Sequence, residues 1–136
     1  MELQNAMQAS TSGLNAQSQR LRIIAENIAN AESLSTIKGG DPYRRKVVIF
    51  NDELNRKTGV EEVKIKAVRK DTGDFKKEYD PNHPAADEKG YVKMPNVNRF
   101  IEMMDMKEAQ RSYEANLQAI DVSRTMLRDT IRLIGN

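Results

Sequence analysis

The sequence predicts an α+β protein in which long N- and C-terminal helices pair as a coiled-coil-like stem and a small β-rich domain lies between them. Apolar residues near both ends recur at alternating steps of three and four, which places them on one narrow seam of a helix. Between the ends, apolar and polar residues alternate and are separated by glycine and proline turns, as is typical of strands. We therefore divide the chain into an N-terminal helical segment (1–36), a β-rich middle (37–98) and a C-terminal helical segment (99–136).

The N-terminal helix is expected to run from residue 1 to about residue 33 and to be weak on its own. Its seam contains polar Ser10 and Gln17, and Gly13 lies in its interior. A glycine inside a helix costs about 1 kcal/mol relative to alanine, so packing against a partner must supply most of the stability. The positions that we expect at a subunit interface are Leu3, Met7, Leu14, Leu21, Ile24, Asn27, Ile28 and Asn30.

The middle segment begins with a turn at Gly39-Gly40-Asp41-Pro42 and is expected to contain three strands. Residues 71–74 are expected to form the hairpin turn between the second and third strands, with a positive φ at Gly73. Two prolines end the third strand, and the chain from there to residue 98 is expected to be extended or looped. The predicted strands cover residues 43–50, 60–70 and 75–79.

The C-terminal helix is expected from Arg99 to Ile134, with Gly135 at the position of a helix stop. Apolar stripes at helical spacing usually belong to an intramolecular core. Here the stripes are long and the rest of the chain is short, which favours burial of part of the seam between subunits. The interface positions expected on this helix are Met103, Met106, Tyr113, Asn116, Leu117, Ile120, Leu127 and Ile131.

Composition excludes several kinds of site. The 136-residue chain has no cysteine, which removes disulfides, thiolate catalysis and cysteine-type zinc sites. Its 22 basic and 20 acidic residues give a net charge of +2, which argues neither for nor against a polyanionic partner. The N-terminus lacks the basic start and the apolar run of a secretory signal, so we expect no cleaved signal. The longest apolar run, residues 47–50, is too short for direct membrane insertion.

No residue pattern indicates catalysis. His83 is the only histidine and lies between Pro81 and Pro84 in an expected surface turn, whereas a catalytic histidine needs an orienting partner and a pocket. Asp80 and Asp87 flank it without the spacing of metal ligands. We therefore expect a structural or solvated role for His83, and no enzyme activity, cofactor, metal or small-molecule substrate.

Basic residues at 44–46 and 64–70 are the only candidates for a nucleic-acid patch. Acidic residues at 61–62 and 71–74 are interleaved with them. We therefore favour the solvated face of a small sheet and expect no nucleic-acid partner.

Asn27 and Asn30 lie three residues apart in an apolar context, and two interpretations of them remain open. Asparagine is common where a helix frays at its end. A half-buried amide can also set register, because it must find a partner and therefore penalises wrong pairings.

These asparagines belong to a set of motifs that resembles the bacterial flagellar rod and hook protein family. The run Ser-Gly-Leu-Asn-Ala-Gln at 12–17, followed by Asn-Ile-Ala-Asn at 27–30, is similar to the N-terminal signature of that family. The middle is most similar to the proximal-rod branch of the family. The segments that carry this similarity are 39–46, 79–84, 90–92 and 94–98, together with Tyr-Glu-Ala-Asn at 113–116. The resemblance covers essentially the whole chain.

The resemblance implies a structural, non-enzymatic subunit of the flagellar rod, the drive shaft that crosses the periplasm. It implies export by the flagellar type III apparatus, and terminal helices that line an axial tube and contact copies of the chain and other rod proteins. Polar seam residues such as Gln17 and Gln110 would then fix register under torque. A subunit of another helical export assembly is the alternative, and a nucleic-acid-binding module is a more distant one.

Overall fold

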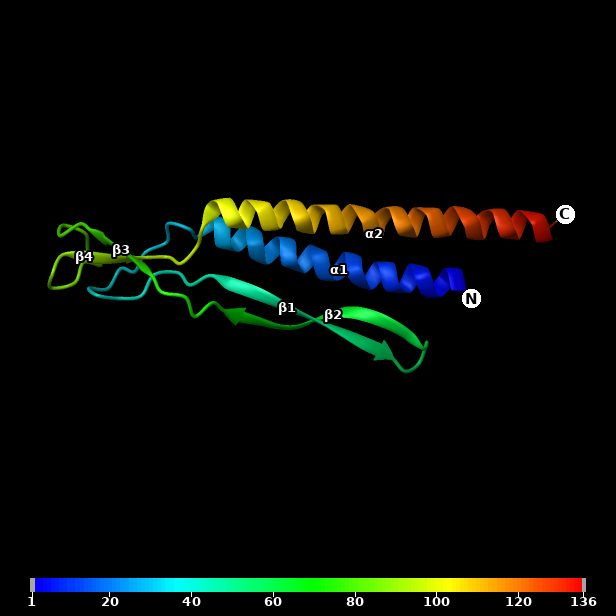
Figure 1. Ribbon diagram of the computed structural model, residues 1–136, viewed down its shortest axis with the longest axis horizontal. Helices are drawn as coiled ribbons and strands as arrows, with labels where there is room; N and C mark the ends of the chain where they lie inside the picture. Colours follow the sequence, from blue (N-terminus) through cyan, green and yellow to red (C-terminus); the bar gives the residue numbers. More distant parts are fainter. Residues whose placement is uncertain (1, 136) are drawn as a thin grey trace. The chain divides into compact units, whose positions relative to one another are not determined.

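A computed structural model of the chain describes residues 2–135, so the outermost residues of the predicted helical segments, 1 and 136, lie outside the described residues. The predicted α+β class is confirmed, because a long helix stands near each end and two small sheets form between them (Figure 1). The elements are α1 (Glu2–Ala29), β1 (Lys46–Asn55), β2 (Val60–Lys70), β3 (Lys76–Tyr79), β4 (Tyr91–Met94) and α2 (Arg99–Ile134).

The chain folds into two compact units, each built from segments that are distant in sequence. Unit 1 comprises the segment up to Leu21, the segment Ile49–Ala67 and the segment from Lys107 onward. Unit 2 comprises Arg22–Val48 and Val68–Met106. Both helices and both strands of the β1–β2 pair contribute residues to each unit.

In unit 1, α1 and α2 are antiparallel and pack through small residues (Figure 1). Ala16 and Ala109 are almost completely buried. A Cβ atom placed on Gly13 would lie 2.8 Å from Nδ2 of Asn116, so the two backbones approach closely there. Because small residues occupy the contact, the large apolar side chains of the pair lie beside it.

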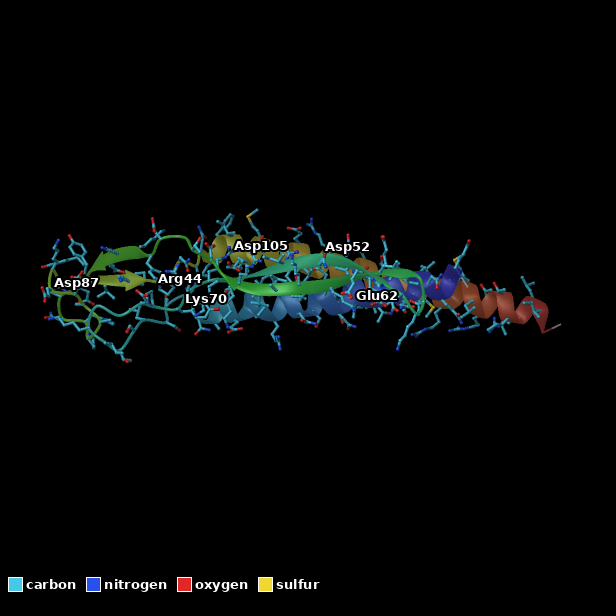
Figure 2. The ribbon with its side chains drawn as sticks, turned by 90° about the horizontal axis from the view of Figure 1, so that it is seen from below. Arg44, Asp52, Glu62, Lys70, Asp87 and Asp105 are labelled. Carbon is cyan, nitrogen blue, oxygen red and sulfur yellow. The ribbon has the colours of Figure 1, made fainter. Side chains whose placement is uncertain are left out.

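The β1–β2 pair contacts α1 of unit 1 through β2. The backbone N–H of Val63 donates a hydrogen bond to Oγ of Ser12 at 3.0 Å. The carboxylate of Glu62, labelled in Figure 2, accepts hydrogen bonds from Gln8 and Asn55. These two hydrogen bonds lower the pKa of the Glu62 carboxyl. The contact is therefore polar on the exposed side of the strand.

Unit 2 contains the β3–β4 sheet and a small apolar core. The two strands are antiparallel, with Tyr79 opposite Tyr91. Gly90, just before β4, has a φ of 84°, and a Cβ atom there would lie 2.9 Å from the Tyr79 ring. Glycine is therefore required on both backbone and steric grounds. The buried core residues are Ala85, Ala86 and Val92, with Leu34 packed against them.

The predicted hairpin between the second and third strands is wrong. β2 pairs with β1, and β3 pairs with β4, which lies where the sequence predicts only extended or looped backbone. The N–H of Asp71 donates to the carbonyl of Arg45, and its carboxylate accepts the N–H of Gly73. The chain therefore leaves β2 on a local side-chain turn, and Gly73 is not among the glycines with positive φ.

Element bounds agree with the sequence pattern for β2 and α2 and differ for two others. β1 starts and ends later than predicted, because residues 43–45 direct their side chains into unit 2 contacts. α1 ends at Ala29 and not near residue 33. There the side-chain amide of Asn30 donates to the carbonyl of Glu26, which satisfies one of the free carbonyls of the helix end.

Candidate assembly surface

In unit 1, the predicted interface positions are partly or largely accessible to a neighbouring molecule. Leu117 and Ile131 on α2 are 43% and 61% exposed. The others are half-buried, which is the state of side chains at the margin of a helix contact. These are Leu3, Met7, Leu14 and Leu21 on α1, and Tyr113, Asn116, Ile120 and Leu127 on α2.

The apolar members of this set share one side of the helix pair. An antiparallel pair has a local two-fold axis perpendicular to the plane of its axes. On each helix, the residue that directly follows a contact residue therefore points to the same side of the helix pair. Gly13 and Asn116 form such a contact, and Leu14 and Leu117 follow them. We call this surface the apolar flank; it comprises Leu3, Met7, Leu14, Leu21, Tyr113, Leu117, Ile120, Leu127 and Ile131.

The row of α2 that is buried against its surroundings is one that the sequence pattern misses. Ala109, Asn116 and Ser123 recur every seven residues; Ala109 is 0% and Ser123 8% exposed. The predicted row through Leu117 and Ile131 lies one residue further along the helix and points outward. Hydrophobic periodicity detects large apolar side chains, whereas this helix contact is made by small and polar ones.

Exposed large apolar side chains are concentrated on α2. Among the described residues of α1, by contrast, no large apolar side chain is exposed. Grouped exposed apolar side chains on a protein surface mark an interaction site, and the methionines among them adapt their shape to a partner. The exposed set on α2 is Phe100, Ile101, Met103 and Met104 in unit 2, and Leu117, Val122, Met126, Ile131, Leu133 and Ile134 in unit 1.

In unit 2, Asn27 is completely buried, and its amide satisfies all of its hydrogen bonds within the chain. Nδ2 donates to the carbonyl of Lys46 at 2.8 Å and to Oε2 of Glu102 at 3.3 Å. Oδ1 accepts from the hydroxyl of Tyr43 at 2.8 Å and from the N–H of Lys46 at 2.9 Å. Asn27 therefore ties the end of α1 to β1 and to the first turns of α2.

Asn30 has a different role. Its side chain bonds to the carbonyl of Glu26 and accepts a hydrogen bond from Ser33, both close in sequence. Of the two interpretations of these asparagines, helix-end chemistry describes Asn30, and registration of separate segments describes Asn27. Of the remaining predicted positions in unit 2, Ile24 is buried, Ile28 and Met106 are half-buried and Met103 is exposed.

Charged groups surround Asn27. Glu102 is 1% exposed and pairs with the guanidinium of Arg45, which also contacts Asp71 at 3.1 Å and Asp105 at 3.5 Å. Burial lowers the pKa of Arg45, but hydrogen bonds to Glu102 and Asp71 outweigh it and raise the pKa overall. We call Asn27, Tyr43, Arg45, Asp71 and Glu102 the junction cluster.

Two further pKa shifts reflect this environment. Burial, together with the negative charges of Glu26 and Glu102, raises the pKa of Tyr43 to about 12. The N–H of Gly73 and the side chain of Arg45 lower the pKa of Asp71. Both groups are held by hydrogen bonds within the chain, Tyr43 to Asn27 and Asp71 to Arg45 and Gly73, so the shifts describe a structural joint.

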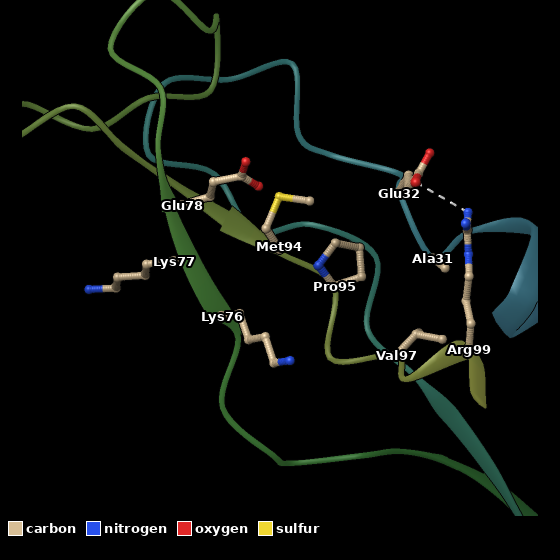
Figure 3. A pocket seen from close by; sticks show the side chains of 9 residues that line it. All are labelled: Ala31, Glu32, Lys76, Lys77, Glu78, Met94, Pro95, Val97 and Arg99. Atoms are coloured by element: carbon tan, nitrogen blue, oxygen red, sulfur yellow. Dashed lines mark ion pairs between the residues drawn. The ribbon is translucent and has the colours of Figure 1, made fainter. Parts of the chain in front are cut away.

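Unit 2 also has an open pocket of about 420 Å³ beside β3 and β4 (Figure 3). Met94, Pro95 and Val97 form its apolar part. At its edge Arg99 pairs with Glu32 at 3.3 Å. An open pocket whose rim charges pair with each other lacks the convergent polar groups of a substrate site.

The basic residues that raised the nucleic-acid alternative are largely engaged within the chain. Lys64 pairs with Glu53 and Glu62, and Lys46 pairs with Glu26. The guanidinium of Arg44, labelled in Figure 2, lies 4.1 Å from the centre of the Phe75 ring and donates to two backbone carbonyls. Such interleaved pairs are typical of a solvated surface.

His83 lies in a turn whose backbone it stabilises. Its Nδ1 atom accepts the N–H of Ala85 at 3.0 Å, and its own N–H donates to the carbonyl of Asp80. Across residues 2–135, no group of three or more His, Asp or Glu side chains is arranged to hold a metal ion. Within the same residues, neither helix combines the length and apolarity needed to span a bilayer.

Two family models match the two ends of the sequence. The model described as "Flagella basal body rod protein" matches residues 7–32. The model described as "Flagellar basal body rod FlgEFG protein C-terminal" matches residues 88–133. These ranges include most of the α1 contribution to the apolar flank and nearly all of α2.

Curated relatives match over almost their full length. The chain is 56% identical over 132 residues to the flagellar basal-body rod protein FlgC of Agrobacterium fabrum, covering 97% of this chain and 95% of the relative. It is 41% identical over 133 residues to FlgC of Escherichia coli O6:H1, covering 98% of each. It is 36% identical over 151 residues to FlgC of Borreliella burgdorferi, covering 98% of this chain and 99% of that protein.

Proposed function

This chain belongs to the FlgC family of flagellar basal-body rod proteins and is a structural subunit of the flagellar basal body, and from that premise we propose that it joins the rod through the apolar flank. The observation that carries the proposal is that half-buried Leu14 and exposed Leu117 each follow the Gly13–Asn116 contact and therefore lie on the same side of the helix pair. Burying such side chains against a neighbour returns about 25 cal/mol per Å² of apolar surface.

The three segments divide this work. The helical segments 1–36 and 99–136 carry the flank. The middle segment 37–98 is attached to them and supplies the remaining contacts with neighbouring subunits. Within unit 2, Met103, Met106 and Ile28 are further candidate contacts, whereas Ile24 is buried inside the unit and supports the end of α1. Asn27 and Asn30 act on assembly indirectly, by holding the end of α1 in place.

Gln17 supports a polar contribution to register. Its Oε1 atom is buried, and no described residue donates a hydrogen bond to it. A buried acceptor without a donor costs about 1–3 kcal/mol. A donor from a neighbouring subunit would remove that penalty in the correct register and leave it in place in a wrong one.

The junction cluster transmits load between the helices and the sheets. Asn27 joins α1, β1 and α2, and Arg45 extends the connection to Asp71. In a shaft that turns, such a joint resists sliding of the sheets relative to the helices.

The partners are copies of the chain and other rod subunits, and the rod crosses the periplasm. The subunit reaches it through the flagellar type III export apparatus, and it acts without catalysis.

Charge substitutions on the flank test this function. Leu21→Asp and Leu117→Asp should reduce the number of assembled rods per cell by about tenfold or more, the effect of losing ~1.4 kcal/mol at a contact. Gln19→Asp, at an exposed position of α1 about 140° around the helix from Leu14, is the matched control and should assemble normally. Basal-body imaging and motility give the readout, and circular dichroism of each purified variant confirms folding. Normal rods in both flank variants would remove the flank from the interface.

A further inference from the structure

A second row of apolar and small side chains runs along α2 within unit 1, outside the apolar flank. Its large members Val122, Met126 and Leu133 are 58%, 52% and 81% exposed. Its small members Ala115 and Ala119 are also exposed. The steps of four, three, four and seven residues keep these five side chains on one face of the helix. We call this row the second stripe; it comprises Ala115, Ala119, Val122, Met126 and Leu133.

The second stripe and the apolar flank point in different directions. Val122 is five residues beyond Leu117, and at ~100° per residue the two side chains are about 140° apart around the helix axis. One neighbouring helix cannot cover both. A symmetric dimer made through the flank would leave the second stripe of each copy in water, because an isologous interface uses the same patch twice.

Charge indicates which surface fits the second stripe. Between residues 112 and 128 the charged side chains of α2 are Glu114, Asp121, Arg124 and Arg128. All four lie at least about 100° around the helix from the centre of the stripe. Asp129 lies about 50° from that centre, beside Leu133, so the uncharged part of the face covers the 17 residues that contain Ala115, Ala119, Val122 and Met126. Burying such a face costs no desolvation of ionised groups.

The α1 side of the apolar flank has the matching property. Residues 3–19 contain no Asp, Glu, Lys or Arg at all, so this part of α1 is uncharged around its whole circumference. It presents the large side chains Leu3, Met7 and Leu14, and the second stripe offers small Ala115 and Ala119 beside larger Val122. Large side chains opposite small ones are the condition for close helix packing.

We propose that the second stripe of one copy receives the α1 side of the apolar flank of a second copy. The proposal rests on the proposed function, and it adds the partner surface and the mode of contact. Each copy then offers two different patches, one to each neighbour. Such a heterologous contact repeats from copy to copy around a ring or along a helix, and it does not stop at a dimer.

Cysteine cross-linking tests the pairing directly, because the chain has no cysteine of its own. We would replace the chromosomal gene with variants carrying Leu14→Cys, Val122→Cys or both, and treat motile cells with a short bismaleimide. The double variant should give a ladder at multiples of the 15.5 kDa chain. Each single variant should give no product. Cells expressing the two single variants together should give a dimer and nothing larger. Gln19→Cys combined with Val122→Cys is the matched control and should not cross-link, because Gln19 is exposed and points about 140° away from Leu14.

Each other result overturns the inference. A dimer from Leu14→Cys alone would indicate an isologous contact through the flank. A product of Val122→Cys with a chain of different mass would assign the second stripe to another rod protein. Motile cells with no product from the double variant would remove the pairing and leave the rod function intact, whereas failure of the proposed function would appear in the flank charge variants.

Discussion

The side-chain amide of Asn116 on α2 lies against Gly13 on α1, where the two helices of unit 1 meet. A Cβ atom on Gly13 would meet Nδ2, Oδ1 and Cγ of Asn116 at 2.8, 3.0 and 3.1 Å. The contacting atoms are the end of a flexible side chain, so the contact tolerates a small addition better than a large one.

Gly13 is therefore predicted to accept alanine and to reject leucine. In Gly13→Ala the Asn116 amide moves aside, and the gain in helix propensity of about 1 kcal/mol offsets the displacement. In Gly13→Leu the helices must separate, which displaces the apolar flank. Rod number in basal-body preparations should be normal for the first variant and strongly reduced for the second. Gln19→Leu places a leucine at an exposed position of α1 that faces neither Gly13's contact nor the flank, and it should resemble the parent chain. A defect there would mean that any extra leucine on α1 is harmful.

Asn27 is predicted to be more important for stability than Asn30. Asn27→Ala removes the hydrogen bond to Oε2 of the buried Glu102, which keeps Arg45, and leaves the hydroxyl of Tyr43 and backbone groups of Lys46 without their Asn27 partner. This should lower the free energy of unfolding by about 3 kcal/mol. Asn30→Ala removes contacts local to a helix end and should cost less than about 1 kcal/mol. Urea denaturation of the purified variants measures both. Equal losses would show that Asn27 is no more than a helix-end residue.

Arg45 and Glu102 are predicted to be strongly coupled. Arg45→Met leaves a nearly fully buried carboxylate without its counter-ion, which should destabilise the fold by about 3–5 kcal/mol. Adding Glu102→Leu removes that charge and should recover a large part of the loss. A double-mutant cycle in urea gives the coupling energy. A coupling near zero would mean that water or other groups already compensate Glu102 and that the junction cluster is not a unit.

Tyr43 is predicted to make stability fall at alkaline pH. Its pKa is about 12 in the folded chain against an ordinary value of 10.0, so the unfolded chain loses the phenolic proton first. Below pH 10 both states hold the proton, and the full contribution to stability is present. As pH rises from about 10 to about 12 that contribution is lost. Urea titrations across this range should show a shallower decline for Tyr43→Phe than for the parent chain. Identical slopes would exclude Tyr43 as the source.

The helices are predictable from sequence for a simple reason. Leu14, Leu21 and Leu117 are large and regularly spaced, and regular spacing of large apolar side chains is the signal that a helical period produces. The same signal places β2 correctly. It gives no information about which strand pairs with which, because pairing of short strands is decided by the turns between them. The side chain of Asp71 redirects the chain at such a turn.

The buried row of α2 and the junction cluster are not predictable in this way. Ala109 and Ser123 are too small to register as apolar periodicity, although they lie where α2 is most buried. Glu102 looks like an ordinary solvated residue of a first helical turn, and only the convergence of Arg45 and Asn27 from elsewhere in the chain explains its burial. Such sites depend on contacts between segments, and a pattern within one segment does not contain them.

The junction cluster also sets the order in which the chain can fold. Asn27 and Glu102 are 75 residues apart in sequence, and Arg45 and Glu102 are 57 apart. Closing loops of that length is slow, because the chain loses conformational entropy before the stabilising contacts of the cluster can form. A chain that emerges with its N-terminus first therefore cannot complete the cluster until residue 102 has followed. Until then Asn27 and Arg45 lack their shared partner, so the start of α2 completes the joint that holds the end of α1 and the start of β1.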